Sequence, residues 1–340
     1  MRLAIYGAGS LGTVLGAYLA KDGIAVDLIS RNQAHIKALQ EKGATIKGSI
    51  SMQVPVSALL PEQMEGTYDC IILLTKQLEN EKVATFLKPF LAEHGLVCTM
   101  QNGLPEPLLQ EILTEERVCG CTIGWGATLL EPGIAQLTSN TDSLTFNLGM
   151  GSDKQNPLLS SLAEVLSHMG KVTIEKNFLG TRYAKLLINA AFSGLGTVLG
   201  CTFGEVAGNK KARLLAQRIM KECLDTAKAS YIVLEKVQGK DIAKLFDYHS
   251  ALKRWFSYQL IPLALKKHRS IKPSMLQDIE KGKPCEVDAI NGVLSEQAHS
   301  KGVKTPVNDQ VVAIIHEIEK GNLKSGWDNL QLFEKRIESF

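Results

Sequence analysis

The run Gly7-Ala8-Gly9-Ser10-Leu11-Gly12 constrains this chain more than any other feature of its sequence. It directly follows the apolar run Leu3–Tyr6 and precedes an amphipathic stretch that reaches about Asp22. In a strand–loop–helix unit of this kind, the first glycine permits a tight turn and the second lets the backbone approach a pyrophosphate. The third allows the helix to pack closely on the strand. We therefore expect a Rossmann domain that contacts a dinucleotide through these residues.

Short apolar runs alternate with amphipathic segments through the first half of the chain. Besides a helix at Arg31–Lys42, the pattern predicts buried parallel strands at Ala25–Ile29, Cys70–Leu74, Leu96–Met100 and Val118–Ile123. After a turn at Pro132-Gly133, the alternating runs Ile134–Leu137 and Ser143–Leu148 predict antiparallel strands that extend the sheet edge. The expected fold is an α/β Rossmann domain with a doubly wound, mostly parallel sheet over residues 1–176.

Beyond Phe178 the strand patterns stop and helical periodicity takes over. Helices are predicted over Tyr183–Leu199, Lys210–Leu234, Ile242–Lys267, Ser274–Lys281, Glu286–Ser300 and Asn308–Lys320. Ser274 and Gln277 have the spacing of a capping box, in which each side chain bonds the other's backbone. We expect an all-α C-terminal domain over residues 177–340.

Composition narrows the class of protein. A net charge of +3 over 340 residues is too weak to predict a nucleic-acid or membrane partner. The apolar runs are too short for a signal peptide or a membrane span. The seven cysteines are scattered, without the paired spacing of zinc ligands, and are expected to be buried thiols. These features predict a cytoplasmic protein with no structural metal.

The end of the second predicted strand bears on the choice of cofactor. NAD-dependent enzymes usually place an acid there to bind the ribose hydroxyls, whereas this chain has Ser30-Arg31-Asn32. Arg31 can pair with the 2′-phosphate of NADP(H), although an ordinary solvated arginine is the alternative reading. Asp27 lies inside the strand and should not reach the ribose. Lys76, after the Cys70–Leu74 strand, is a second candidate contact for phosphate or adenine.

Polar residues in two apolar settings are candidates for chemistry. Asn102 ends the Leu96–Met100 strand within Gln101-Asn102-Gly103, where it is either part of a simple turn or a contact for nicotinamide or substrate. Lys185 and Asn189 are four positions apart in an apolar helix and would share one face. Burying an unpaired ammonium is costly, so Lys185 is either functional or a structural lysine that reaches solvent.

Several segments together resemble the ketopantoate reductase (2-dehydropantoate 2-reductase) family. They are the glycine run, Gln101-Asn102-Gly103, Arg182–Asn189, and Ser274–Leu294 with its sequence SMLQDIEKGKPCEVDAINGVL. The resemblance covers nearly the whole chain and implies a Rossmann domain followed by a helical domain. It also implies reduction of ketopantoate to pantoate by NADPH, a step toward pantothenate and coenzyme A.

The resemblance also implies residue roles. Lys185 would be the general acid that protonates the forming alkoxide, and Asn102 and Asn189 would orient the substrate and Lys185. Ser274 would bond the substrate carboxylate, Glu286 would accept the substrate's distal hydroxyl, and Asn291 would be structural or peripheral.

The chain departs from the family pattern in two places. Ser193 stands where members of the family carry an asparagine, and its shorter reach would change how the substrate hydroxyl is recognised. The stretch 235–273 is longer than in compact members; its residues Trp255, Phe256, Tyr258 and His268 could reshape the substrate site or a subunit interface.

Other functions therefore stay open. One is a related 2-hydroxyacid dehydrogenase acting on another small 2-oxo acid, and another is a non-catalytic NADP(H)-sensing protein. The oligomeric state is open too, with a homodimer formed through the helical domain as one option.

Overall fold

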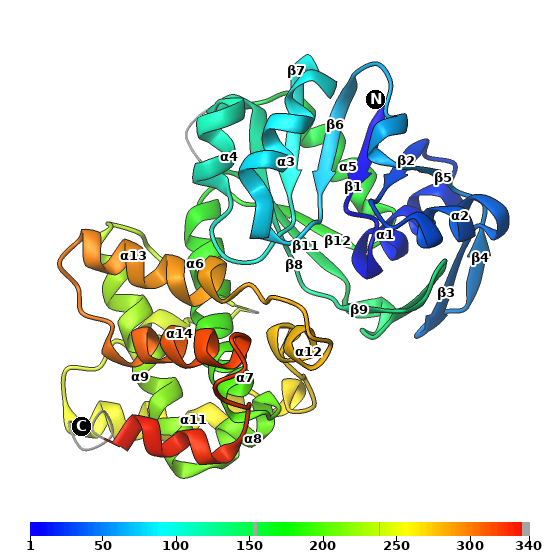
Figure 1. Ribbon diagram of the computed structural model, residues 1–340. Helices are drawn as coiled ribbons and strands as arrows, with labels where there is room; N and C mark the ends of the chain where they lie inside the picture. Colours follow the sequence, from blue (N-terminus) through cyan, green and yellow to red (C-terminus); the bar gives the residue numbers. More distant parts are fainter. Residues whose placement is uncertain (152–154, 238, 335–340) are drawn as a thin grey trace. The chain divides into compact units, whose positions relative to one another are not determined.

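The computed structural model describes residues 1–151, 155–237 and 239–334. The chain divides into two compact units, drawn from blue to green and from green to red in Figure 1. The first comprises Met1–Gln101 and Pro105–Phe178, and the second comprises Asn102–Leu104 and Leu179–Phe340. The first unit contains two hydrophobic cores and the second unit contains one.

An eight-stranded sheet with the order β12-β11-β8-β7-β6-β1-β2-β5 forms the centre of the first unit. The strands from β8 to β5 run parallel to one another, whereas β11 is antiparallel to β8 and parallel to β12. The bounds are β1 Leu3–Tyr6, β2 Val26–Ile29, β5 Ser57–Leu59, β6 Tyr68–Leu73, β7 Leu91–Thr99, β8 Val118–Ile123, β11 Thr145–Met150 and β12 Lys171–Ile174. The predicted mostly parallel Rossmann sheet is confirmed.

Helices cover both faces of this sheet (Figure 1). Successive residues of a strand point to opposite faces, so Leu3 and Ile5 of β1 join one core while Ala4 and Tyr6 join the other. The first core lies under α1, α2 and α5, and the second lies under α3 and α4. The bounds are α1 Ser10–Lys21, α2 Gln33–Lys42, α3 Asn80–Leu87, α4 Glu106–Leu113 and α5 Leu158–Ser167.

A second sheet, with the order β4-β3-β10-β9, packs against α1. Its bounds are β3 Ala44–Gly48, β4 Met52–Val54, β9 Ala127–Glu131 and β10 Ile134–Leu137. The prediction that Ile134–Leu137 extends the main sheet is wrong, although β11 does so. The turn at Pro132-Gly133 folds β10 back onto β9, and the other edge of β10 then pairs in parallel with β3.

The second unit is helical, and its described residues contain one isolated β-bridge, between Val237 and Lys240. Its α-helices are α6 Phe178–Ile188, α7 Leu195–Leu199, α8 Phe203–Gly208, α9 Lys210–Ala229, α10 Ile242–Phe246, α11 Ala251–Ala264, α12 Ser274–Glu280, α13 Val293–Ser300 and α14 Pro306–Glu319. Two segments with π-helical hydrogen bonding, Asn189–Gly194 and Asp288–Gly292, join α6 to α7 and lead into α13.

Three predicted helices are therefore irregular, and the one expected over Glu286–Ser300 contains the π-helical segment Asp288–Gly292 before α13. The helix expected over Tyr183–Leu199 changes from α to π at Asn189, and the one expected over Ile242–Lys267 breaks between α10 and α11. At the second break, Ser250 caps the new helix by accepting the backbone N–H of Lys253. An apolar pattern continues across such breaks because both parts bury a face against the same core.

All seven cysteines are buried, as predicted. Burial raises the pKa of thiols such as Cys70 in the sheet and Cys223 in α9. Within the described ranges, no helix is long and apolar enough to cross a membrane.

Candidate functional site

The glycine run forms the turn between β1 and α1. Gly7 has a φ of +106°, and a Cβ added there would lie 2.5 Å from the backbone nitrogen of Thr75. A Cβ on Gly12 would lie 2.7 Å from the carbonyl oxygen of Gly7. Both positions therefore require glycine to let the turn and the helix pack closely.

Gly9 differs from its two neighbours in the motif, because a Cβ there would meet no heavy atom of the described residues within 4 Å. It is the N-cap of α1, and within the described residues no side chain caps this helix end. The first backbone N–H groups of α1 thus lie beside open space, where the helix dipole favours negative charge. The arrangement fits a pyrophosphate group.

Arg31 and Lys76 lie just beyond the carboxyl ends of β2 and β6, the two neighbours of β1. Arg31 is exposed, and its Nη1 donates to a carboxylate oxygen of Glu79 at 2.9 Å. Lys76 is partly buried and directly precedes the short helical turn Gln77–Glu79. The two predicted phosphate contacts therefore occupy the sheet edge that carries the glycine turn.

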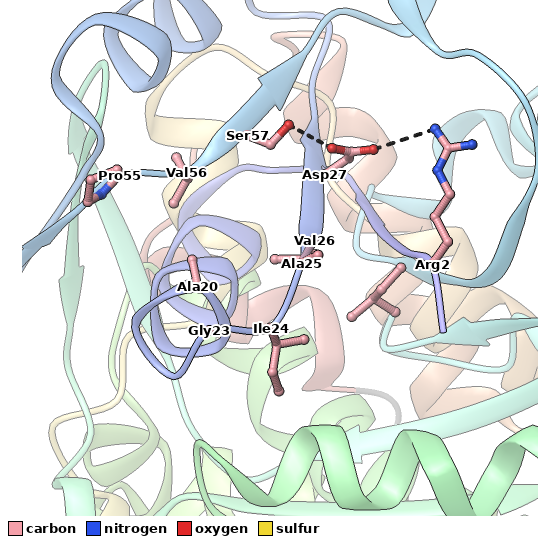
Figure 2. A pocket seen from close by; sticks show the side chains of 11 residues that line it. Arg2, Ala20, Gly23, Ile24, Ala25, Val26, Asp27, Pro55, Val56 and Ser57 are labelled. Carbon is pink, nitrogen blue, oxygen red and sulfur yellow. Dashed lines mark hydrogen bonds and ion pairs between the residues drawn. The ribbon is translucent and has the colours of Figure 1, made fainter.

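Asp27 lies toward the amino end of β2, where its carboxylate has hydrogen-bond partners. Its carboxylate accepts hydrogen bonds from Ser57 Oγ at 2.6 Å and Tyr68 Oη at 2.9 Å, and it faces Arg2 at 3.9 Å. Asp27, Ser57 and Arg2 border a pocket next to the amino end of β2 (Figure 2). Burial, together with the bond to Asp27, raises the pKa of Tyr68 to about 12. Asp27 is thus fixed away from the glycine turn.

In the second unit, Lys185 lies half-buried on α6, one helical turn before the π-helical segment Asn189–Gly194. Since hydrogen bonds in a π-helix span five residues, Asn189 and Ser193 do not stack as they would in an α-helix. Ser193 is 6% exposed, and its carbonyl accepts the hydroxyl of Thr197.

The second π-helical segment packs on the first. Asn291, fully buried, donates from Nδ2 to the carbonyl of Ala190 at 3.0 Å and to Oδ1 of Asn308 at 2.7 Å. A Cβ on Gly194 would lie 2.8 Å from the same Nδ2. Asn291 therefore holds the segment that begins with Asn189.

Glu286 and Ser274 lie on segments that contact the same region. Glu286 is 8% exposed and lies just before the second π-helical segment, where its backbone carbonyl accepts the N–H of Ile290. Ser274 is exposed and begins α12, which packs on the first π-helical segment. The predicted capping box is wrong, because Pro273 is the N-cap and Gln277 bonds the carbonyl of Lys272 instead.

Asn102 belongs to the helical unit although it follows a strand of the sheet. Leu104 packs against the helical core, which ties the segment Asn102–Leu104 to the unit that holds Lys185. The preceding Gln101 is anchored in the first unit, where its Nε2 donates to the carbonyl of Thr75 at 2.8 Å and to Asn80 Oδ1 at 2.7 Å. The structure thus gathers the segments of Asn102, Lys185, Asn189, Ser274 and Glu286 in one unit.

Glu79, which lies at the carboxyl end of the parallel strands together with Arg31 and Lys76, was not predicted from the sequence. Glu79 lies 48 positions from Arg31, so a search for acids near the end of the second strand does not find it. The signal that could have found it is its place just after the β6 strand, the neighbour of β1 on the side away from β2.

Comparisons with known proteins agree with this architecture. Residues 3–150 match the family model described as "Ketopantoate reductase PanE/ApbA", and residues 177–319 match "Ketopantoate reductase PanE/ApbA C terminal". The 2-dehydropantoate 2-reductase of Lactococcus lactis subsp. lactis is 29% identical over 332 residues, covering 94% of this chain and 98% of the relative. That of Pyrococcus horikoshii is 27% identical over 317 residues, covering 93% and 96%.

Among solved structures, the fold is similar to that titled "The ternary structure of D-mandelate dehydrogenase with NADH and anilino(oxo)acetate". The TM-score is 0.81 at 24% identity, covering 95% of this chain and 100% of that one. Fold and relatives together define the class, an oxidoreductase built from a Rossmann domain and a helical domain. Within that class, the chain belongs to the ketopantoate reductase family.

Proposed function

We propose that this protein reduces ketopantoate to pantoate with NADPH. The observation that carries the proposal is the packing of the π-helical segment Asn189–Gly194, which directly follows the helix of Lys185. This segment contacts α12, which begins with Ser274, and the π-helical segment Asp288–Gly292, which lies just after Glu286. The named 2-dehydropantoate 2-reductases that align over more than nine-tenths of the chain support the choice of substrate.

The Rossmann unit would hold the cofactor, which supplies a hydride when bound. The N–H groups at the start of α1 and the open space at Gly9 suit the pyrophosphate. Arg31 and Lys76 add positive charge at the same sheet edge, which favours the 2′-phosphate of NADPH over the 2′-hydroxyl of NADH. Asn102 would contact the nicotinamide or the substrate.

Lys185 would donate a proton from Nζ to the carbonyl oxygen of the substrate as that oxygen gains negative charge. A general acid of this kind typically contributes about 10²–10⁴-fold to the rate. The ammonium charge also stabilises the developing alkoxide, and it does so more strongly in the half-buried setting of α6 than in water. Asn189, held through the Ala190–Asn291 bond, would orient Lys185 and the substrate.

The other polar residues would select the substrate. Ser274, exposed at the start of α12, would bond the carboxylate of the 2-oxo acid. The carboxylate of Glu286 would accept a hydrogen bond from the distal hydroxyl of ketopantoate. Because Glu286 is buried, this bond would be stronger than one at the surface. Ser193 would contribute a shorter contact to the same hydroxyl.

The test is a comparison of kcat/KM for NADPH-dependent reduction of several small 2-oxo acids by the purified full chain. The panel contains ketopantoate, its analogue without the hydroxyl, and an aromatic 2-oxo acid. We expect ketopantoate to be preferred by at least about tenfold, the value of one good hydrogen bond. Preference for the aromatic acid would instead make the protein a 2-hydroxyacid dehydrogenase with the same fold, and binding of NADPH without any turnover would favour a sensor.

A further inference from the structure

The ion pair between Arg31 and Glu79 has a consequence for the choice of nicotinamide cofactor. Glu79 accepts a hydrogen bond from Arg31 Nη1 at 2.9 Å, and its other carboxylate oxygen accepts one from Lys82 Nζ at 3.1 Å. These hydrogen bonds lower the pKa of the Glu79 carboxyl, so the group is ionised at neutral pH. A full negative charge therefore contacts the guanidinium that would receive the 2′-phosphate.

The backbone around Glu79 is fixed rather than loosely exposed. The next residue, Asn80, is 2% exposed, and its side-chain amide pairs with that of Gln101 through bonds of 2.7 and 3.1 Å. Gln101 in turn donates to the carbonyl of Thr75, which lies between β6 and the Glu79 turn. The amide pair thus ties the turn that carries Glu79 to the end of β7.

Glu79 and Arg31 also lie beside the last residue of β1. Burial is the main cause that raises the pKa of Tyr6; the charge of Arg31 opposes this rise, and the charges of Glu62 and Glu79 add to it. Tyr6 directly precedes Gly7, so the ion pair stands at the same edge as the glycine turn.

We infer that Glu79 is a determinant of cofactor specificity that weakens binding of NADPH relative to NADH. The 2′-phosphate carries nearly two negative charges. It must either share Arg31 with the carboxylate of Glu79 or displace that carboxylate from Arg31. The 2′-hydroxyl of NADH carries no charge and can instead donate a hydrogen bond to an acid at this edge. Glu79 thus supplies, from the loop after β6, the acid that is missing after β2. The inference rests on the proposed function in one respect, that Arg31 faces the 2′ position of the cofactor.

The test measures dissociation constants of NADPH and NADH for the full chain, without substrate, by nucleotide fluorescence. Glu79→Gln removes the charge and keeps the size of the side chain. Glu81→Gln is the matched control, because Glu81 is an exposed acid in the first turn of α3, two positions after Glu79. Comparing Arg31→Ala with the double variant Arg31→Ala/Glu79→Gln shows whether the effect of Glu79→Gln on cofactor affinity requires Arg31.

We expect Glu79→Gln to raise affinity for NADPH about three- to tenfold and to leave affinity for NADH unchanged or weaker. Glu81→Gln should change both within about twofold, and the gain from Glu79→Gln should vanish when Arg31 is alanine. A fall in NADPH affinity would show that Glu79 instead supports Arg31, and an unchanged ratio, or a gain that persists without Arg31, would equally overturn the inference.

These failures are distinct from a failure of the proposed function. If the wild-type protein reduces ketopantoate with NADPH but Glu79→Gln leaves the cofactor ratio unchanged, only the role of Glu79 is refuted. If the wild-type protein binds both nucleotides but does not reduce ketopantoate, the proposed substrate is refuted and the ratio still decides the role of Glu79. If it binds neither nucleotide, both fail.

Discussion

Asn291 donates a hydrogen bond to the backbone carbonyl of Ala190, 101 positions earlier in the chain, at 3.0 Å. Each residue lies in a π-helical segment, and the bond is fully buried. Ala190 directly follows Asn189, so the bond positions a proposed substrate contact without touching the substrate. Asn291 is therefore a positioning residue in this account.

Replacing Asn291 with alanine should leave the Ala190 carbonyl and Asn308 without this partner. We expect a loss of about 1–3 kcal/mol in the free energy of unfolding, measured by urea denaturation, and a fall in kcat of about tenfold or more. Asn329→Ala is the control, because Asn329 makes a similar buried bond to the carbonyl of Val198 in α7. It should lower stability comparably and kcat much less; equal effects on kcat would refute the positioning role.

Gly7 and Gly9 belong to the same turn, but their alanine variants are expected to behave in opposite ways. Gly7→Ala introduces a clash at 2.5 Å and a strained φ of +106°, so it should lower stability by about 2 kcal/mol or more. Gly9→Ala places a methyl group in open space, so the protein should fold normally and lose about tenfold or more in NADPH affinity. Calorimetry and nucleotide fluorescence check the two properties, and unchanged affinity in Gly9→Ala would place the pyrophosphate elsewhere.

Glu286→Ala tests recognition of the distal hydroxyl. Since hydrogen bonds to charged groups are worth about 1.5–3 kcal/mol, kcat/KM for ketopantoate should fall about 10- to 100-fold. The value for the analogue without the hydroxyl should change little. Glu280→Ala, at an exposed position of α12, serves as the control. Equal losses for both substrates would assign Glu286 to the chemistry or to folding.

The buried carboxyl group of Glu222 should make the free energy of unfolding depend on pH. It is 2% exposed and accepts the backbone N–H groups of Val307 and Asn308 at the start of α14. Burial raises its pKa from 4.5 to about 7, against the opposing effect of those bonds and of Arg218. As pH rises, the unfolded chain therefore releases this proton before the folded chain does.

The free energy of unfolding should accordingly fall as pH rises from about 4.5 to about 7 and change little above that range. The expected loss is on the order of 3 kcal/mol. Glu222→Gln lacks the titrating group and should show a correspondingly flatter profile in urea denaturation across the same range. Parallel profiles for the two proteins would contradict the raised pKa.

The parts of the fold that were predictable have local causes. Residue type and spacing alone predict the glycine turn and the buried apolar strands β1, β2, β6, β7 and β8. The strands β3, β4, β5 and β12 could not be predicted in this way, because they are short and partly exposed. The pairing of β10 with β3 likewise depends on contacts that no local window contains.

The candidate site shows the same division. Lys185, Asn189 and Glu286 could be named from their surroundings and from a family resemblance. The π-helical segment at Asn189 could not, because a one-residue shift in backbone hydrogen bonding leaves the apolar pattern intact. The contact of Glu79 with Arg31 could not be foreseen either, since two separate strand ends must first meet at one sheet edge.

The most direct test of the central claim follows NADPH absorbance with ketopantoate for the wild-type protein, Lys185→Ala and the control Lys176→Ala. Lys176 is an exposed lysine that precedes α6. We expect turnover by the wild-type protein and by Lys176→Ala. For Lys185→Ala we expect a loss of about 10²–10⁴-fold in kcat, with NADPH binding retained. Undiminished reduction by Lys185→Ala, or no reduction of ketopantoate by the wild-type protein, would contradict the central claim.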